Sequence, residues 1–321
     1  MHFFCALRPL CDMLRHLVPH RLSLAVAFVF VAGCAAEEPL RMPRLAPREA
    51  PGRPKASSPH EGASPRAGGL ACSDTADGFE PWLAAFEAQA AAGGISRRTL
   101  TLALGDLSYA PEVIAQDRGQ RAFSHTFEEL VQKRVPPARV TRGRAMMHTH
   151  AALLARIEAT FGVAPSLLVA LWGLETDFGQ NVGTYPTFRA LATLAYDCRR
   201  AERFRGELLA ALRIVDRGDM NADDMVGAWA GEIGQTQFLP TSYEAHAVDF
   251  DGDGKADLVR SSADALASTA SYLRGHGYAA GKPYHRGTPN YDVLGSWNAS
   301  DMYRRVIVHY AERLEDRPSK R

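Results

Sequence analysis

The sequence predicts a mainly α-helical fold, α+β in class, with at most a small sheet. Apolar residues recur every three to four positions in several segments, which is the period of an amphipathic helix. Long runs of alternating apolar and polar residues, which would indicate strands, are scarce. The chain has 321 residues and is 46% hydrophobic and 9% aromatic. That composition favours one domain of about 200–250 residues with appendages.

The N-terminus has the features of an export signal. Arginines and histidines between Arg15 and Arg21 precede an apolar run from Leu22 to Val31. This run is about half the length that spans a bilayer. We therefore expect residues 1–34 to be a signal peptide rather than a transmembrane helix.

The end of the apolar run, Val-Ala-Gly-Cys at residues 31–34, resembles the lipobox of bacterial lipoproteins. The resemblance implies lipidation of Cys34, and Ala35 and Ala36 match the pattern that is sorted to the outer membrane. The expected location is the periplasm, with the protein lipid-anchored at the outer membrane. Ordinary cleavage after a small residue, with Cys34 incidental, is the alternative.

Residues 35–70 are predicted to be a linker. Seven of the 19 prolines fall within these 36 residues, and no apolar periodicity is present. A Pro-rich chain extends about 3.1 Å per residue, so this linker could reach roughly 110 Å. Residues 71–316 are expected to form the folded domain.

Two cysteines remain for the mature domain, Cys72 and Cys198, if the signal is removed and Cys34 is acylated. In an oxidising compartment, two cysteines favour one disulfide. Two buried thiols are the alternative.

Helical stripes follow in chain order. The first is Phe79, Trp82, Leu83 and Phe86; the next is Leu153, Leu154, Ile157 and Phe161. Pro165 suits the first turn of a helix that runs through Ser166 to Thr176. The last stripe is Phe204, Leu208, Leu212 and Val215, and Gly218 ends it.

Glu175 follows a segment, Leu167 to Leu174, that is apolar on every face of a helix. Apolar surroundings disfavour a charged carboxylate and raise its pKa, and the C-terminal end of the helix dipole acts in the same direction. A carboxyl that keeps its proton near neutral pH suits general acid catalysis. A structural role, bound to an arginine or a neighbouring amide, is the alternative.

Several motifs follow one another around and after Glu175. They are Trp172-Gly-Leu-Glu-Thr-Asp-Phe-Gly179, Ala190-Leu-Ala-Thr-Leu-Ala-Tyr-Asp197 with Arg199-Arg200, Gly234-Gln-Thr-Gln-Phe-Leu-Pro-Thr-Ser-Tyr243, and Ala247-Val-Asp-Phe-Asp-Gly-Asp-Gly254. In this order they resemble the membrane-bound lytic transglycosylase B family, over roughly residues 79–314. The resemblance implies a lysozyme-like core with additional helical segments around a long glycan groove, and a catalytic domain within residues 71–316.

The resemblance also implies the chemistry. Glu175 would act as acid and then as base in cleaving the bond between N-acetylmuramic acid and N-acetylglucosamine of peptidoglycan, leaving a 1,6-anhydromuramic end. Ordinary glycoside hydrolysis needs two carboxylates, for which Asp177 and Glu232 are the candidates. A lysozyme-type muramidase and a non-catalytic peptidoglycan-binding lipoprotein remain alternatives. The second would gain if Glu175 were exposed and paired with an arginine.

Further positions match family residues that line the groove or orient the catalytic glutamate. They are Arg199, Arg200, Gln237, Phe238, Tyr272, Asn298 and Tyr303. Two positions depart from the family pattern, because Ala228 stands in place of a serine and Leu130 in place of a groove tyrosine. Glu232 is the candidate to replace that serine as the partner of Glu175.

The segment from Asp249 to Asp257 matches the first nine places of an EF-hand loop. Its calcium ligands would be Asp249, Asp251, Asp253, Lys255 through its carbonyl, and Asp257. The twelfth place is Arg260, which cannot ligate, so either Asp264 closes a longer loop or the segment is a polar turn. Calcium here would be structural.

The charge balance limits the partners. The formal charge is +1, from 37 basic and 36 acidic residues, which gives no electrostatic footprint for wrapping a nucleic-acid backbone, so we expect no nucleic-acid partner. We expect peptidoglycan glycan strands as the partner, membrane contact only through the lipid anchor, a monomer, and no cofactor for the chemistry.

Overall fold

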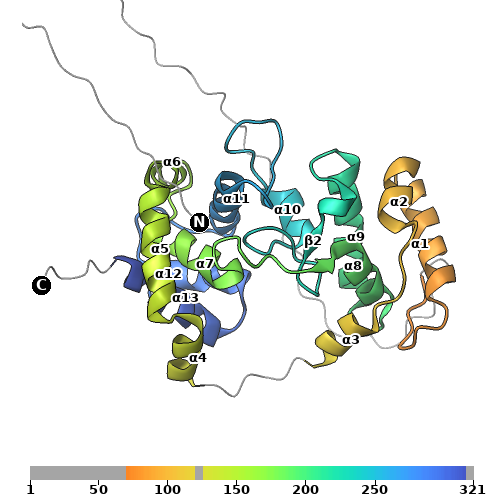
Figure 1. Cartoon of the computed structure of the whole chain (residues 1–321), viewed down its shortest axis with the longest axis horizontal. Coiled ribbons are helices and arrows are strands. Elements are labelled where there is room, and N and C mark those ends of the chain that lie inside the picture. Colours follow the sequence, from red (N-terminus) through yellow and green to blue (C-terminus); the bar gives the residue numbers. More distant parts are fainter. Residues whose placement is uncertain (1–69, 120–125, 316–321) are drawn as a thin grey trace, which may run out of the picture. The chain divides into compact units, whose positions relative to one another are not determined.

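The computed structural model describes residues 70–119 and 126–315 (Figure 1). The predicted signal peptide, Cys34 and nearly all of the predicted linker lie outside these residues. Within them, no single helix is long and apolar enough to cross a membrane. Only α6 (Ala151–Phe161) and α7 (Pro165–Thr176), which are bent by 112°, have the length and composition for it as a pair.

The described residues are mainly helical, as the apolar periodicity predicts. Around a first core lie α1 (Phe79–Ala92), α2 (Arg97–Leu104), α3 (Pro111–Arg118), α8 (Thr187–Tyr196), α9 (Ala201–Asp216) and α10 (Pro240–His246). Around a second core lie α4 (Phe127–Arg134), α5 (Pro137–Thr149), α6 (Ala151–Phe161), α7 (Pro165–Thr176), α11 (Ser262–Gly275), α12 (Pro289–Trp297) and α13 (Asp301–Glu315). The described part also contains the short 3-10 helix η1 (Ala222–Asp224).

Two short strands lie between the helices of the first core. β1 (Tyr185–Pro186) pairs antiparallel with β2 (Val226–Gly227), with Tyr185 opposite Gly227. The described residues thus contain only a two-residue ribbon of sheet, in agreement with the predicted small β content.

The predicted helical stripes form the two cores. Phe79, Trp82 and Phe86 of α1 are buried in the first core, where their rings stack on one another. Leu154 and Ile157 of α6 are buried in the second. The prolines at N1 of α7 and α10 fit positions whose amide has no partner within the helix.

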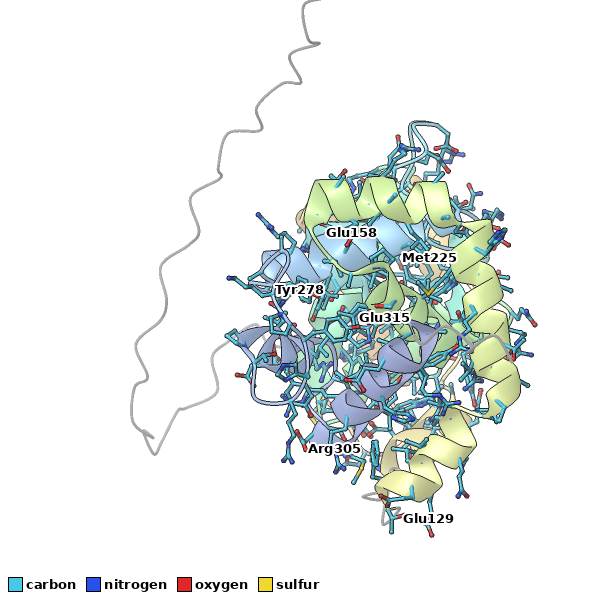
Figure 2. The ribbon with its side chains drawn as sticks, turned by 90° about the vertical axis from the view of Figure 1, so that its left-hand side faces the viewer. Glu129, Glu158, Met225, Tyr278, Arg305 and Glu315 are labelled. Atoms are coloured by element: carbon cyan, nitrogen blue, oxygen red, sulfur yellow. A yellow bond between two sulfur atoms is a disulfide. The ribbon has the colours of Figure 1, made fainter. Side chains whose placement is uncertain are left out.

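Helix α7 runs through the centre of the second core. Its residues from Leu167 to Leu171 are fully buried, because α5, α6, α11 and α13 all pack against it. Figure 2 shows the second core facing the viewer, with Glu158 of α6 near the top and Glu129 of α4 at the bottom. The packing fixes the direction in which the C-terminal end of α7 points.

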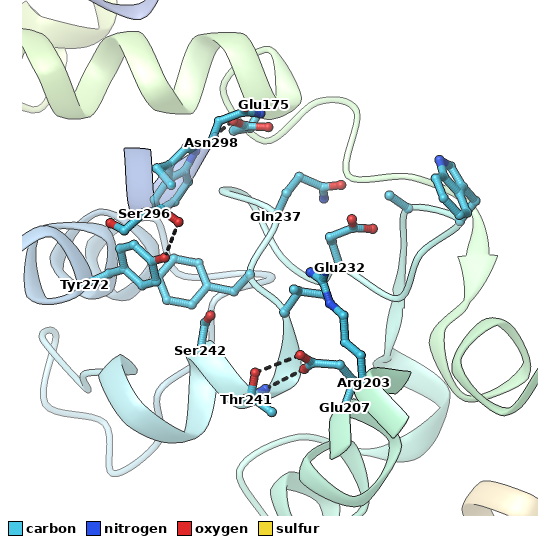
Figure 3. A pocket seen from close by; sticks show the side chains of 15 residues that line it. Glu175, Arg203, Glu207, Glu232, Gln237, Thr241, Ser242, Tyr272, Ser296 and Asn298 are labelled. Atoms are coloured by element: carbon cyan, nitrogen blue, oxygen red, sulfur yellow. Dashed lines mark hydrogen bonds between the residues drawn. The ribbon is translucent and has the colours of Figure 1, made fainter. Parts of the chain in front are cut away.

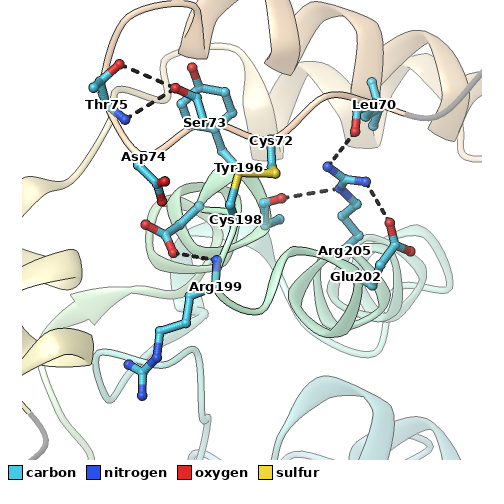
Figure 4. The surroundings of a disulfide bond; sticks show 12 residues. Leu70, Cys72, Ser73, Asp74, Thr75, Tyr196, Cys198, Arg199, Glu202 and Arg205 are labelled. Carbon is cyan, nitrogen blue, oxygen red and sulfur yellow. Dashed lines mark hydrogen bonds and ion pairs between the residues drawn. A yellow bond between two sulfur atoms is a disulfide. The ribbon is translucent and has the colours of Figure 1, made fainter. Parts of the chain in front are cut away.

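A disulfide joins Cys72 to Cys198 (Figure 4). The two cysteines are 126 residues apart in sequence. Their bond ties the segment before α1 to the turn between α8 and α9. Nearby, the Arg205 guanidinium donates to the carbonyl oxygen of Leu70 at 2.8 Å. The start of the described chain is therefore held on the first core at two points.

Candidate active site

A cavity of about 540 Å³ lies where the two cores meet (Figure 3). The second core contributes the end of α7, α11 and α12, and the first core contributes α9, the segment between β2 and α10, and the first turn of α10. The lining residues are Glu175, Arg203, Glu207, Ala228, Trp229, Glu232, Gln237, Phe238, Leu239, Thr241, Ser242, Tyr272, Ser296, Trp297 and Asn298.

Glu175 lies in the last turn of α7 and faces this cavity. One carboxylate oxygen, Oε1, accepts hydrogen bonds from Trp297 Nε1 at 2.9 Å and from the Tyr303 hydroxyl at 3.0 Å. No hydrogen bond within the described chain involves Oε2. The two donors therefore orient the carboxyl group and leave its second oxygen for a ligand.

Burial raises the pKa of Glu175 above its ordinary value, as the apolar helix predicts. The hydrogen bonds from Trp297 and Tyr303 and the charge of Arg134 act in the opposite direction, while the charge of Glu232 adds to the rise. Burial and the neighbouring Glu175 also raise the pKa of Tyr303 well above its ordinary value, so this residue stays a hydrogen-bond donor.

Asp177, two residues beyond Glu175, does not line the cavity. It is the C-cap of α7 with a left-handed φ of 53°, and it turns the chain away from the helix. Its carboxylate accepts from Arg139 Nε at 3.2 Å and from Arg142 Nη2 at 2.6 and 2.7 Å. These two ion pairs give Asp177 a structural position.

The segment from Gly234 to Phe238 connects α7 to the opposite wall. Trp172 Nε1 donates a hydrogen bond to the side-chain oxygen of Gln235 at 3.1 Å. The Thr176 hydroxyl donates to the backbone carbonyl of Gln235 at 2.5 Å. Gln237 has a φ of 58°, and its amide donates to the carbonyls of Val182 and Gly234 at 3.0 Å. This backbone conformation holds the Gln237 side chain at the cavity.

Aromatic rings form one wall of the cavity. Phe238 packs edge to face against Tyr272 and Trp297, at centroid distances of 5.8 and 5.7 Å. The Tyr272 hydroxyl donates to the carbonyl of Ser296 at 2.6 Å. Flat apolar faces beside amide and hydroxyl groups suit the two faces of a sugar ring.

The structure brings Gln237, Phe238, Tyr272 and Asn298 together with Glu175 around the cavity. Tyr303 does not line it and contacts Glu175 from α13 instead. Arg199 and Arg200 are also not among the lining residues, because both guanidinium groups bind the buried Asp117. Their contact with a glycan remains a prediction.

Trp297 is the direct partner of Glu175 that sequence reasoning missed. It lies 122 residues from Glu175, and the only local signal is its position next to Asn298. Trp297 and Tyr303 are the groups that bind Glu175 in this chain, which has Ala228 rather than a serine in the cavity wall. The described residues show no hydrogen bond between Glu232 and Glu175, so Glu232 does not replace the serine as a direct partner.

Leu130, the other departure from the family pattern, packs against the second core from α4 and does not line the cavity.

The acidic loop lies apart from the cavity, between α10 and α11. Carboxylate oxygens of Asp249, Asp251 and Asp264 lie within 4.8 Å of one another. Asp264 is buried, and it accepts from the backbone amides of Phe250 at 2.8 Å and Asp257 at 2.9 Å. Asp264 therefore closes the loop, whereas Asp253 and Asp257 are outside this group of three.

The guanidinium group of Arg260, at the twelfth place, pairs with Asp224 at 2.5 Å and with Asp257 of the loop at 3.4 Å. Burial raises the pKa of Asp264, and the charge of Asp251 adds to the rise. Three converging carboxylates repel one another unless a cation lies between them, and all-oxygen ligands are those that calcium prefers. The residues present thus fit a calcium ion.

The fold and the site place the chain in the lysozyme-like class of helical domains. Residues 78–288 match the family described as "Transglycosylase SLT domain", and the chain belongs to this family.

Two kinds of relative support the assignment. Membrane-bound lytic murein transglycosylase B of Escherichia coli (strain K12) is 36% identical over 151 residues. These residues are 47% of this chain and 42% of that protein, so the match spans less than half of this curated relative.

Among solved structures, SltB3 from Pseudomonas aeruginosa has a TM-score of 0.70 and 33% identity, over 74% of this chain and 79% of that one. It was crystallised with NAG-anhNAM-pentapeptide and with NAG-NAM-pentapeptide. The soluble lytic transglycosylase SltB1 from the same organism has a TM-score of 0.69 and 26% identity, over 73% and 98% of the two chains.

Proposed function

We propose that the chain is a lytic transglycosylase that cleaves the β-1,4 bond between N-acetylmuramic acid and N-acetylglucosamine in peptidoglycan. The observation that carries this proposal is the environment of the Glu175 carboxyl group, which is partly buried and held by two hydrogen bonds. Burial raises the pKa of its carboxyl group, two donors hold Oε1, and Oε2 is left for the cavity. The names of the similar proteins and the peptidoglycan fragments bound to SltB3 support the same substrate.

In the proposed reaction the protonated Glu175 gives its proton to the bridging oxygen as the bond to C1 breaks. The substrate's own acetamido group assists at C1. The carboxylate then takes the proton of the C6 hydroxyl as O6 attacks C1. The hydrogen bonds from Trp297 and Tyr303 stabilise the carboxylate between the two steps. No water is consumed, and the product has a 1,6-anhydromuramic end.

A muramidase would need a second, ionised carboxylate beside the bond. Asp177 is held by Arg139 and Arg142 away from the cavity. Glu232 lines the cavity, but burial raises its pKa and favours the neutral form. One carboxyl acting twice therefore agrees better with the site than a hydrolytic pair.

A non-catalytic binding protein would favour a Glu175 that is exposed and paired with an arginine. Instead, Glu175 is partly buried, and its partners within the described residues are an indole and a phenol. The arrangement therefore supports catalysis.

The remaining features extend this proposal. Calcium would be held by Asp249, Asp251 and Asp264 and would stabilise the loop without taking part in the reaction. A lipid on Cys34 would anchor the domain in the periplasm at the outer membrane, and residues 35–70 would let it reach glycan strands as a monomer. The residues expected to contact glycan are Arg199, Arg200, Gln237, Phe238, Tyr272 and Asn298.

Mass spectrometry of purified sacculi digested with the protein tests the proposal. We expect muropeptides with anhydromuramic ends. Reducing muramic ends would instead assign the protein to the muramidases, and intact sacculi would favour the non-catalytic alternative.

A further inference from the structure

The cavity contains a second carboxyl group, Glu232, that the proposed proton transfers do not use. Glu232 lies in the turn after β2, where its carbonyl accepts from the amide of Ala228 at 3.0 Å. The turn has little freedom, because a Cβ at Gly227 would lie 1.7 Å from the Glu232 carbonyl oxygen. A Cβ at Gly231 would lie 2.2 Å from the Leu191 side chain. The close packing of these glycines therefore fixes the position of the Glu232 backbone, from which its side chain reaches the cavity.

One oxygen of this carboxyl group has no partner. Oε2 of Glu232 is buried and makes no hydrogen bond within the described chain. In Figure 3 the Glu232 carboxyl and the Gln237 amide point toward the same space, which Glu175 also faces. Buried polar atoms normally have a hydrogen-bond partner, so an orphan atom at a cavity wall indicates a group that a ligand completes.

The charged groups around Glu232 determine its protonation. Burial raises the pKa of Glu232, while the backbone amides of Glu232 and Ala230 act against the rise, as do the charges of Arg203 on α9 and of Arg200 at its N-cap. Glu175 faces the same cavity, and the two acids disfavour each other's ionisation.

The third carboxylate of the cavity, Glu207, is occupied. It accepts hydrogen bonds from the backbone amide and the hydroxyl of Thr241, both at 2.9 Å. Glu232 is thus the acid of this wall that is available to a ligand. A neutral carboxyl offers one donor and one acceptor, which match the amide and hydroxyl groups of an N-acetylated sugar.

We propose that Glu232 is a substrate-binding residue that, as a carboxylic acid, hydrogen-bonds an N-acetyl or hydroxyl group of the glycan strand in the cavity. The inference rests on the proposed function for its substrate. Glu232 would then supply a polar contact to the glycan on the wall of the cavity where the Ala228 side chain supplies none.

The test measures binding separately from turnover. In a Glu175→Gln background, Glu232→Gln and Glu232→Ala are added, and the fraction of protein bound to purified sacculi is titrated from acid to alkaline pH. Glu80→Gln, on the exposed face of α1, is the matched control.

We expect Glu232→Ala to weaken binding by about tenfold, the loss of one hydrogen bond of ordinary strength. Glu232→Gln keeps a neutral donor and acceptor, so it should bind within about threefold of the parent. The parent should bind less well as Glu232 ionises at higher pH. The Gln variant should not show this decline, because its amide does not titrate.

Two results would overturn the inference. One is unchanged binding by a folded Glu232→Ala protein. The other is loss of turnover by Glu232→Gln in the wild-type background with binding unchanged, because the ionised form would then act as a base. Reducing ends from the wild type would refute the proposed function alone, since the binding comparison stays interpretable.

Discussion

Replacing Tyr303 by phenylalanine tests how the site controls Glu175. The substitution removes the hydroxyl that donates to Oε1 at 3.0 Å and leaves the donor Trp297 at 2.9 Å. A hydrogen bond to a charged group is worth about 1.5–3 kcal/mol, and Glu175 carries the charge only after it has given its proton away. The loss should therefore fall on the transition state, with kcat reduced by roughly 10- to 150-fold.

The pH dependence gives a second readout with a defined sign. The Tyr303 hydrogen bond favours the carboxylate and lowers the pKa of Glu175 against the rise that burial causes. Without it the pKa rises further, so the acid stays protonated to higher pH. The alkaline limb of the rate profile should move to higher pH while the maximum falls.

The assay is release of soluble muropeptides from sacculi, measured as kcat and KM across pH. Tyr291→Phe is the control, because its hydroxyl donates to the carboxylate of Asp301 at 2.8 Å but does not contact Glu175. We expect that control to keep the wild-type profile. A folded Tyr303→Phe protein with unchanged kcat and unchanged alkaline limb would refute the reasoning.

Three other predictions concern the remaining assignments. Glu175→Gln keeps the shape of the side chain without a transferable proton, so anhydromuropeptide release should fall by at least about 10²–10⁴-fold; loss of similar size in Asp177→Asn would contradict the assignment. Calcium at about 100 times its dissociation constant should stabilise the fold by about 2.7 kcal/mol, seen as a higher melting temperature that chelator reverses. Asp251→Ala should remove this response, and an unchanged melting curve in chelator would leave the loop as a turn. Cys34→Ser should move the protein from the membrane to the soluble fraction, whereas equal partitioning of both forms would exclude the lipid anchor.

The local part of the site could be read from the sequence. Eight apolar residues before Glu175 predict a buried helix with a carboxyl group at its end, and α7 has this form. The helices α1, α6 and α9 were likewise predictable, because helical periodicity depends on residues three to four positions apart. The sequence also supplied the acidic loop and the two cysteines as candidates.

Only the tertiary structure decided what these residues contact. Trp297 donates a hydrogen bond to Glu175, which lies 122 residues earlier in the chain. Arg199 and Arg200 both bind Asp117, which lies about 80 residues earlier. The first turn of α11 brings the Asp264 carboxylate close to those of Asp249 and Asp251. Sequence periodicity fixes which face of a helix is buried, but the direction of each polar side chain depends on how distant helices pack. The sequence around Glu175 therefore predicted a carboxyl group at the end of a buried helix, and packing between the two cores determined its partners.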